Sequence, residues 1–327
     1  MIEVSKDRLD KIAKKISLDR KINRFSNFIG KVFVPVIAAE LLLSFLMQDK
    51  LHFILWILIF AVADIVLTIA ALFFIIFTDT AAKIIRSTGS ISDAVRMSRL
   101  VRREKIYYEI FNKELCSDEA LAAADRLVKS ADKNKIDYLA ALTLKLCCHD
   151  MRCETDKAGI LLAEIEKLPE KRLIERNEHM VAQLDYCSAA NNDLRYLSVI
   201  EEYSDLLAGT PERCGTGSAL SAFLAIAAQE AVIDRRYDTA LEYYDWALEY
   251  RNEKNTYSKK SPSNLKIYNT AALHLDKAAA LLKMGDAQAA SEELGTADEL
   301  AAELTCEIPP IFLKERGELV SHLTILP

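Results

Sequence analysis

The chain has 327 residues, of which 51% are hydrophobic and 28% are charged, and its net charge is −6. These averages combine two different parts, because residues 28–77 contain only six ionisable side chains while the flanking segments are densely charged. This division excludes a chain that forms one evenly mixed, water-soluble domain.

Residues 1–27 are predicted to form a basic amphipathic juxtamembrane helix. Lysines and arginines cover most of its surface, and such helices often rest on anionic lipid. The alternative is a basic leader that only sets the orientation of the chain in a membrane. The apolar residues that roughly share one face are Leu9, Ile12, Ile16, Ile22 and Phe25.

Two long apolar runs follow, Phe28–Met47 and Leu51–Phe77, of 20 and 27 residues. At about 1.5 Å per residue, each can cross a hydrocarbon core of roughly 30 Å as a helix. Buried core helices usually have shorter apolar runs of about 10 to 14 residues, and the polar stretch before the first run does not fit a secretory signal. Residues 28–78 are therefore predicted to be a two-span transmembrane hairpin.

The positions of lysine and arginine predict the orientation of this hairpin. Residues 1–31 contain nine of them and residues 79–105 contain seven, whereas the turn contains one. By the positive-inside rule both termini are cytoplasmic. All seven cysteines lie after the hairpin, where a reducing compartment would keep them as free thiols. Because no organelle signal is recognisable, we expect a prokaryotic plasma membrane.

Four polar residues interrupt the predicted spans: Glu40 and Ser44 in the first, Asp64 and Thr68 in the second. A charged group at membrane depth costs about 2.5 to 3.5 kcal/mol on insertion scales and normally faces protein or water. Small polar stripes also favour helix association in lipid. Three interpretations follow: contact with a partner's helices or a second copy of the hairpin, a neutral pair that the membrane tolerates, or an ion or proton path in a higher oligomer.

Residues 79–115 are predicted to lead out of the membrane and to provide a basic connecting helix, which Ser92 caps and which runs from Asp93 to about Leu115. We expect the arginines of its first half to face lipid headgroups. Nucleic-acid binding is less favoured, because no base-stacking motif accompanies the charges. These arginines are Arg96, Arg99, Arg102 and Arg103.

From Ile106 onward the charge balance reverses, with 25 lysines and arginines against 38 acidic residues, a net charge of −13. Apolar residues recur at spacings of three and four, with glycines and prolines between the periodic stretches, so we expect helices throughout. Five apolar triplets share the spacing i, i+4, i+7, with steps of 38, 38, 44 and 50 residues between them, which indicates internal repeats with insertions. The triplets begin at Ala120, Ala158, Tyr196, Ala240 and Ala290.

The clearest repeats are residues 224–253 and residues 274–303. Alanines stand where two helices would cross, as in Ala240-Tyr244-Ala247, and Gly285 stands at a turn. The pattern resembles the tetratricopeptide repeat (TPR), a helix-turn-helix unit of about 34 residues. The resemblance implies a TPR-like α-solenoid over residues 116–308, in which each pair shares a core only with its neighbours. The family's tryptophan and Gly-Tyr signature are missing, so a helical-hairpin array outside the family is the alternative.

The resemblance also implies a concave face that holds a protein or peptide partner, and the acidic charge would favour a basic one. Residues 309–327 are predicted to form a C-terminal capping helix that begins at Pro310. The candidate partner-binding residues, taken mainly from the first helices, are Gln229, Asp234, Tyr268, Asn269, His274 and Lys277.

No pattern in the sequence predicts catalysis or a cofactor. Cys147, Cys148, His149 and Cys153 lie close together, but zinc sites usually combine two separated ligand pairs. These residues fall on one predicted helix, which favours buried packing over metal binding. Phosphate-binding glycine loops and hydrolase or metalloprotease motifs are missing from the sequence, so we expect no enzyme activity.

Together these features predict an all-α protein, a transmembrane helical hairpin followed by a TPR-like α-solenoid. We expect a membrane-anchored scaffold or adaptor whose cytoplasmic solenoid binds a protein or peptide partner. The alternative is a subunit of an oligomeric channel or transporter in which Glu40 and Asp64 line or gate the path.

Overall fold

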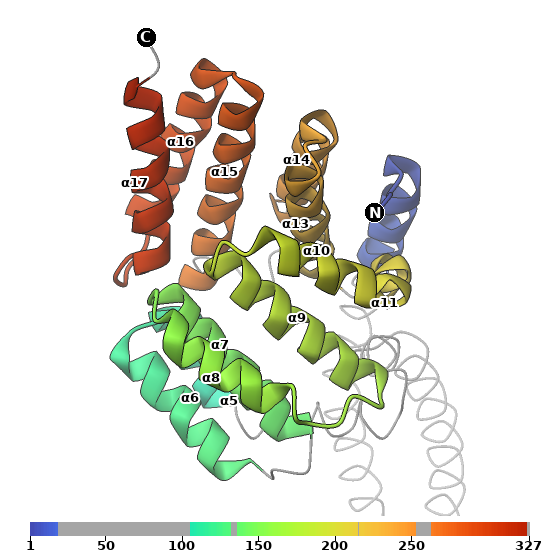
Figure 1. Cartoon of the computed structure of the whole chain (residues 1–327), viewed down its shortest axis with the longest axis vertical. Helices are drawn as coiled ribbons and strands as arrows, with labels where there is room; N and C mark the ends of the chain where they lie inside the picture. Colours follow the sequence, from blue (N-terminus) through green and yellow to red (C-terminus); the bar gives the residue numbers. More distant parts are fainter. Residues whose placement is uncertain (19–104, 132–135, 215, 253–262, 326–327) are drawn as a thin grey trace, which may run out of the picture.

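The computed structural model describes residues 1–18, 105–131, 136–214, 216–252 and 263–325. Within these ranges the chain is helical and has no β-strand, which confirms the all-α prediction. Residues 6–18 form the N-terminal helix. The helices that follow (Figure 1) are α5 (Lys105–Glu114), α6 (Asp118–Ser130), α7 (Ile136–Met151), α8 (Thr155–Ile165), α9 (Leu173–Ala189), α10 (Asp193–Glu202), α11 (Ser204–Ala208), α12 (Thr210–Arg213), α13 (Gly217–Ile233), α14 (Tyr237–Asn252), α15 (Asn264–Met284), α16 (Ala287–Ala302) and α17 (Pro310–Ile325).

Ten of these helices form five pairs joined by short turns: α5–α6, α7–α8, α9–α10, α13–α14 and α15–α16. The second helix of each pair carries one of the predicted triplets. All fifteen triplet residues are buried, from Ala120 in α6 to Ala297 in α16. The alanines let the two helices of a pair approach closely, and the larger triplet residues fill the space beside them. The predicted helical-hairpin array is therefore the arrangement of the described residues.

The five turns share one backbone conformation. Each contains a residue with positive φ, and that residue precedes the first triplet residue by five positions. At the last turn, the Gly285 N–H donates to the Leu282 carbonyl at 3.0 Å and the Asp286 N–H donates to the Leu281 carbonyl at 3.0 Å. This pair of backbone hydrogen bonds is a Schellman motif, and the next three turns upstream have the same two hydrogen bonds. The left-handed residues are Leu115, Cys153, Asn191, Arg235 and Gly285.

Side-chain caps start several of the second helices directly after these turns. The Ser117 hydroxyl accepts from the Ala120 N–H at 3.2 Å, and the Asp286 carboxylate accepts from the Ala289 N–H at 3.0 Å. Such caps satisfy backbone donors that have no partner within the helix. Turn and cap together fix where each second helix begins, which sets the register of its buried triplet.

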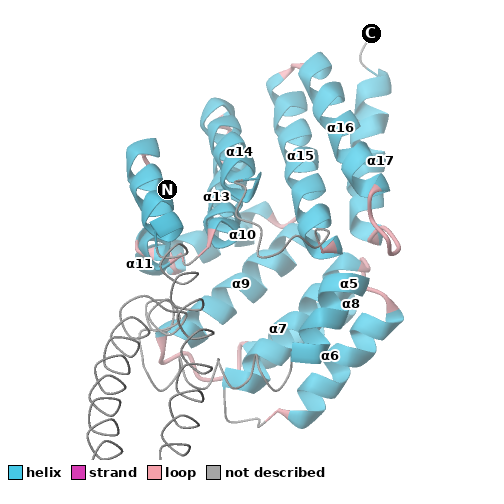
Figure 2. Cartoon of the chain, turned by 180° about the vertical axis from the view of Figure 1, so that it is seen from behind, coloured by secondary structure: helices cyan, strands magenta, loops and turns pink. Residues whose placement is uncertain are grey.

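The first and last pairs share one hydrophobic core, which the sequence analysis did not predict. Phe111 of α5 and Leu115 lie in the same cluster of buried side chains as Leu275 of α15 and Phe312 of α17. Helix α17 also contacts α7, and Figure 2 shows α15, α16 and α17 above α5 to α8 at one end of the array. The expectation that each pair packs only on its neighbours is therefore wrong. The C-terminal helices cover an apolar surface of α5 to α7 that an open solenoid would leave exposed.

Asn264 connects the two ends of the array through hydrogen bonds. This buried side chain donates from Nδ2 to the Lys113 carbonyl at 2.5 Å and accepts at Oδ1 from the Thr305 N–H at 3.2 Å. Asn264 and Lys113 are 151 positions apart in the sequence. A buried amide that is satisfied in this way favours one specific closure of the array.

The N-terminal helix packs onto the array. Its apolar residues Leu9, Ile12 and Ile16 are buried in the cluster that also contains side chains of α9, α10, α13 and α14. The Arg8 guanidinium donates to both carboxylate oxygens of Glu212, at 2.7 and 2.8 Å. This arrangement differs from the expected interfacial helix and from a simple basic leader, because protein already covers the apolar face that lipid was expected to contact.

The predicted hairpin, residues 28–78, lies outside the described residues, and so do Glu40, Ser44, Asp64 and Thr68. Among the helices that the structure describes, none combines the length and the apolar character needed to cross a membrane. Of the predicted connecting helix, residues 79–115, the structure describes α5 and Leu115.

Replacing Gly285 with alanine should lower the free energy of unfolding by about 1 kcal/mol, because an L residue is disfavoured at positive φ. The φ of Gly285 is +97°, and nothing lies within 4 Å of the added Cβ, so strain in the backbone is the only expected effect. The control is Gly295→Ala within α16, which should stabilise by roughly 0.5–1 kcal/mol. Its added Cβ also meets nothing within 4 Å. Denaturant unfolding followed by circular dichroism measures both variants, and shifts in the same direction would contradict the turn assignment.

Candidate functional site

Carboxyl groups with raised pKa values lie on four helices that contact one another in the array, and we name this group the acidic cluster. The helices are α7, α9, α15 and α17, which belong to both ends of the closed array. Burial is the main cause that raises the pKa of every member. The acidic cluster consists of Asp150, Glu178, Asp185, Asp276 and Glu315.

One half of the acidic cluster lies between α7 and α9, which pack against each other. Asp150 belongs to α7, and Glu178 and Asp185 lie two turns apart on one face of α9. Burial, followed by the charge of Asp185, raises the pKa of Asp150 to about 7. The pKa of Glu178 also rises to about 7 through burial and Asp185, although a hydrogen bond with Thr143 opposes the shift. The charge of Asp185 therefore acts on both of the other carboxyl groups at the α7–α9 contact.

The other half joins α15 and α17. Burial and then the charge of Glu315 raise the pKa of Asp276 well above its ordinary value. Burial also raises the pKa of Glu315 to about 7. Lys283 and Lys314 oppose these shifts but do not reverse them. These two acids therefore ionise less readily than exposed carboxyl groups do, as those of the first half also do.

Two buried tyrosines lie near members of the acidic cluster. Burial raises the pKa of Tyr196 in α10 well above its ordinary value, and Asp185 and Asp276 add to the shift. Burial and the charge of Asp276 also raise the pKa of Tyr244 in α14 well above its ordinary value. Because Tyr196 is influenced by carboxylates of both halves, the halves border the same region of the array.

Among the described residues, no ion pair joins a lysine or arginine to a member of the acidic cluster. Asp150 is the extreme case, because its side chain is 6% exposed and neither carboxylate oxygen has a hydrogen-bond partner. The other four members are half-buried. Carboxylates that lose solvation without a compensating positive charge destabilise a fold. Clusters of strongly shifted pKa values are typical of functional sites, so the acidic cluster is the candidate site of this chain.

The residues that the sequence analysis proposed for partner binding lie in different environments. Tyr268 is buried in the core shared by the first and last pairs. Gln229 accepts a hydrogen bond from a buried tyrosine hydroxyl at 3.4 Å. Asp234 ends α13 and pairs with Arg236 at 3.4 Å, and Asn269 is half-buried on α15. The structure does not bring these four residues together in one contact network.

His274 and Lys277, the other two proposed residues, meet at one carboxylate. The Lys277 ammonium lies 2.5 Å from Glu293, and the Nδ1 atom of His274 lies 2.6 Å from the same side chain. Lys277 also pairs with Asp245 at 2.7 Å. These contacts hold α14, α15 and α16 together, so both side chains have structural partners within the chain.

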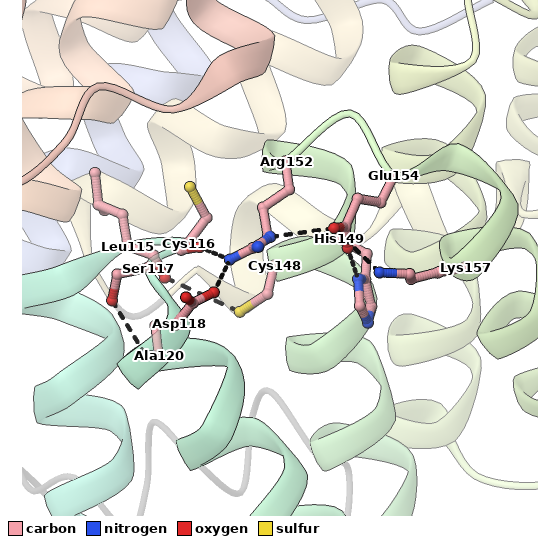
Figure 3. Close-up of polar contacts among 10 residues, drawn as sticks. All are labelled: Leu115, Cys116, Ser117, Asp118, Ala120, Cys148, His149, Arg152, Glu154 and Lys157. Atoms are coloured by element: carbon pink, nitrogen blue, oxygen red, sulfur yellow. Dashed lines mark hydrogen bonds and ion pairs between the residues drawn. The ribbon is translucent and has the colours of Figure 1, made fainter.

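The Cys-rich stretch of α7 forms a structural junction at the turn before α8 (Figure 3). Cys148 is buried in the core, and burial raises the pKa of its thiol to about 12. The Nδ1 atom of His149 lies 2.5 Å from Glu154, and Arg152 donates to Asp118 at 2.8 Å. No group of three or more His, Cys, Asp or Glu residues in the described ranges is arranged to hold a metal ion. These contacts tie α6 to the α7–α8 turn.

Comparison with known proteins does not add a family assignment. No family model, curated protein or solved structure matches the chain. The function is therefore argued from the chemistry of the described residues.

The sequence analysis missed the acidic cluster. Its members come from positions up to 165 residues apart, and the closure that brings them together was not predicted. One local signal was present: Asp150 ends an α7 stretch in which most neighbouring side chains are apolar. An acid in such a stretch suggests a buried carboxylate, but its neighbours in space are not readable from the sequence.

At pH 8, Asp150→Asn should raise the free energy of unfolding by roughly 1–3 kcal/mol. The folded-state pKa of Asp150, about 7, exceeds its ordinary value of 3.8. As the pH rises, the unfolded chain therefore loses this proton first, and stability falls between about pH 4 and pH 7. Asparagine cannot ionise, so the variant avoids the cost of a buried negative charge. At pH 4 this carboxyl group is largely protonated in the folded protein, so the two proteins should differ much less. Guanidinium unfolding at both pH values measures the effect, and an equal difference at both would contradict it.

Proposed function

We propose that this chain is a membrane-anchored scaffold or adaptor whose helical array binds a cationic segment of a protein partner at the acidic cluster. The observation that carries the proposal is the set of five carboxylates, contributed by four helices, without an ion pair to a described lysine or arginine. A partner's lysine or arginine would supply the missing positive charge. Charge-assisted hydrogen bonds to such a group stabilise the ionised carboxylates that the free protein disfavours.

The net charge of the array supports a basic partner as well. Residues 106–327 carry a net charge of −13, with 25 basic against 38 acidic residues. A field of one sign attracts ligands of opposite charge and raises their association rate. The acidic cluster would then provide the local contact that selects among basic segments.

The anchor part of the proposal is supported by the sequence. Residues 28–78 would form the two-span hairpin, with both termini on the cytoplasmic side of a prokaryotic plasma membrane. Within the membrane, Glu40, Ser44, Asp64 and Thr68 would contact a partner's helices or a second copy of the hairpin. The proposed role therefore requires neither a cofactor nor catalysis.

In all five helix pairs the turn residue with positive φ precedes the buried triplet by five positions. This regularity supports a tandem repeat of the tetratricopeptide kind. Arrays of this kind present several helices to one ligand. Three of the four helices that carry the acidic cluster, α7, α9 and α15, are first helices of such pairs. The closed arrangement would place the ligand between helices that are distant in sequence.

A fluorescently labelled, arginine-rich peptide tests this proposal by anisotropy. In the variant Glu178→Gln/Asp185→Asn/Glu315→Gln, the affinity should fall at least about tenfold, or about 1.4 kcal/mol. For the unmodified protein, affinity should rise between about pH 5 and pH 8. The pKa values of these carboxyls are about 6 to 7, so they ionise over that interval.

The matched control removes three negative charges from exposed acids, with the same change in net charge. These side chains form no ion pair with a described residue and lie on α6, α14 and α16, so the control should bind the peptide almost normally. Equal losses in both triple variants would contradict a specific role for the acidic cluster. The control substitutions are Glu119→Gln, Glu242→Gln and Glu299→Gln.

A further inference from the structure

The N-terminal helix exposes a basic stripe on its solvent side. Lys11, Lys14 and Lys15 are exposed, and Leu18, at the end of the described helix, is 57% exposed. These positions follow the spacing i, i+3, i+4, i+7, which places them on one face of a helix. We name these four residues the lysine stripe.

The lysine stripe lies on the opposite side of the helix from the face that packs on the array. At about 100° per residue, the stripe is centred roughly half a turn away from Leu9, Ile12 and Ile16. Those three residues are buried in the array. Docking therefore turns the lysine stripe outward and holds it there.

The cations of this helix differ in what they contact. Lys6 pairs with Glu249 at 2.5 Å, and Arg8 pairs with Glu212 at 2.7 Å. No described residue forms an ion pair with Lys11, Lys14 or Lys15. Lys6 and Arg8 attach the helix to the acidic array, whereas the three lysines of the lysine stripe remain available to an external partner.

An anionic membrane surface fits this stripe by charge and by position. The sequence places the first apolar run ten residues after Leu18, at Phe28, and adds Arg20, Lys21 and Arg24 in between. Lysines close to a bilayer attract acidic phospholipid headgroups, and an exposed leucine can enter the interface beside them. The array itself carries a net charge of −13 from residue 106 onward, so anionic lipid would repel most of its surface.

We propose that Lys11, Lys14, Lys15 and Leu18 form a contact surface for anionic phospholipid headgroups. The docked helix then bridges two partners, with its apolar face on the array and its lysine stripe on the bilayer. It thereby holds the array close to the membrane in one orientation. The inference takes its membrane context from the proposed anchor, but the stripe and the anchor make separable predictions.

Energy transfer from Trp246 to dansyl-labelled lipid headgroups tests the orientation in the full chain. Trp246 is half-buried beside the docked helix, with the Lys6 ammonium 5.6 Å from its ring. The substitution Trp56→Phe removes the only other tryptophan. We expect stronger transfer in phosphatidylserine-containing vesicles than in phosphatidylcholine vesicles. The difference should disappear in 1 M salt, where the Debye length is about 3 Å.

Lys11→Gln/Lys14→Gln/Lys15→Gln should reduce the transfer in anionic vesicles to the phosphatidylcholine level. The control variant Lys129→Gln/Lys167→Gln/Lys171→Gln loses the same charge from exposed lysines elsewhere and should behave like the unmodified chain. Trp246 emission in detergent should be the same in all variants, because the buried face of the N-terminal helix is unchanged.

Vesicle flotation separates the outcomes. Flotation with both lipids and equal transfer in both overturns the lysine stripe and leaves the anchor. Flotation with anionic vesicles alone supports the stripe and contradicts the apolar anchor. Flotation with neither overturns both, and loss of transfer in the control variant as well as in the stripe variant overturns the specific role of the stripe.

Discussion

The burial of α5, α6 and α7 against α15, α16 and α17 is the contact on which the rest of the array depends. It involves fully buried side chains such as Leu115 and Leu275, each worth about 1.5 to 3 kcal/mol of hydrophobic stabilisation. Without this contact the first and last pairs would each expose an apolar face. With it, helices far apart in the sequence are held in one fixed arrangement, and α7 meets α17.

That closure also creates the acidic cluster. Asp150 comes from one end of the array, and Asp276 and Glu315 come from the other. Bringing these carboxylates together opposes folding, because each must lose solvation near others of the same charge. The hydrophobic core of the closure supplies the stabilisation that allows it. Under the proposed function a partner's cation would compensate this cost, and both carboxylate oxygens of Asp150 lack a hydrogen-bond partner in the chain.

Sequence reasoning predicted what is local and periodic. The triplets starting at Ala120 and Ala290 identified the buried faces of the second helices, and the turn at Gly285 was predicted at the position where the structure has it. It did not predict the closure, because two explanations fit the apolar faces of α5 and α17 equally well. Each helix could cap its own end of an open array, or the two ends could pack against each other. The amphipathic pattern of the N-terminal helix was correct, but lipid and protein cover such a face equally well. Of the site, Asp150 alone gave a local signal.

Hydrogen exchange measured by mass spectrometry on the variant Leu275→Ala tests the closure most directly. Leu275 is 1% exposed, and its truncation should destabilise the shared core by about 2 to 5 kcal/mol. If the two ends form one core, amides of α5 and α6 should lose protection together with those of α15 to α17. Loss of protection confined to α13 to α17, the neighbours in sequence, would show an open array and contradict the account.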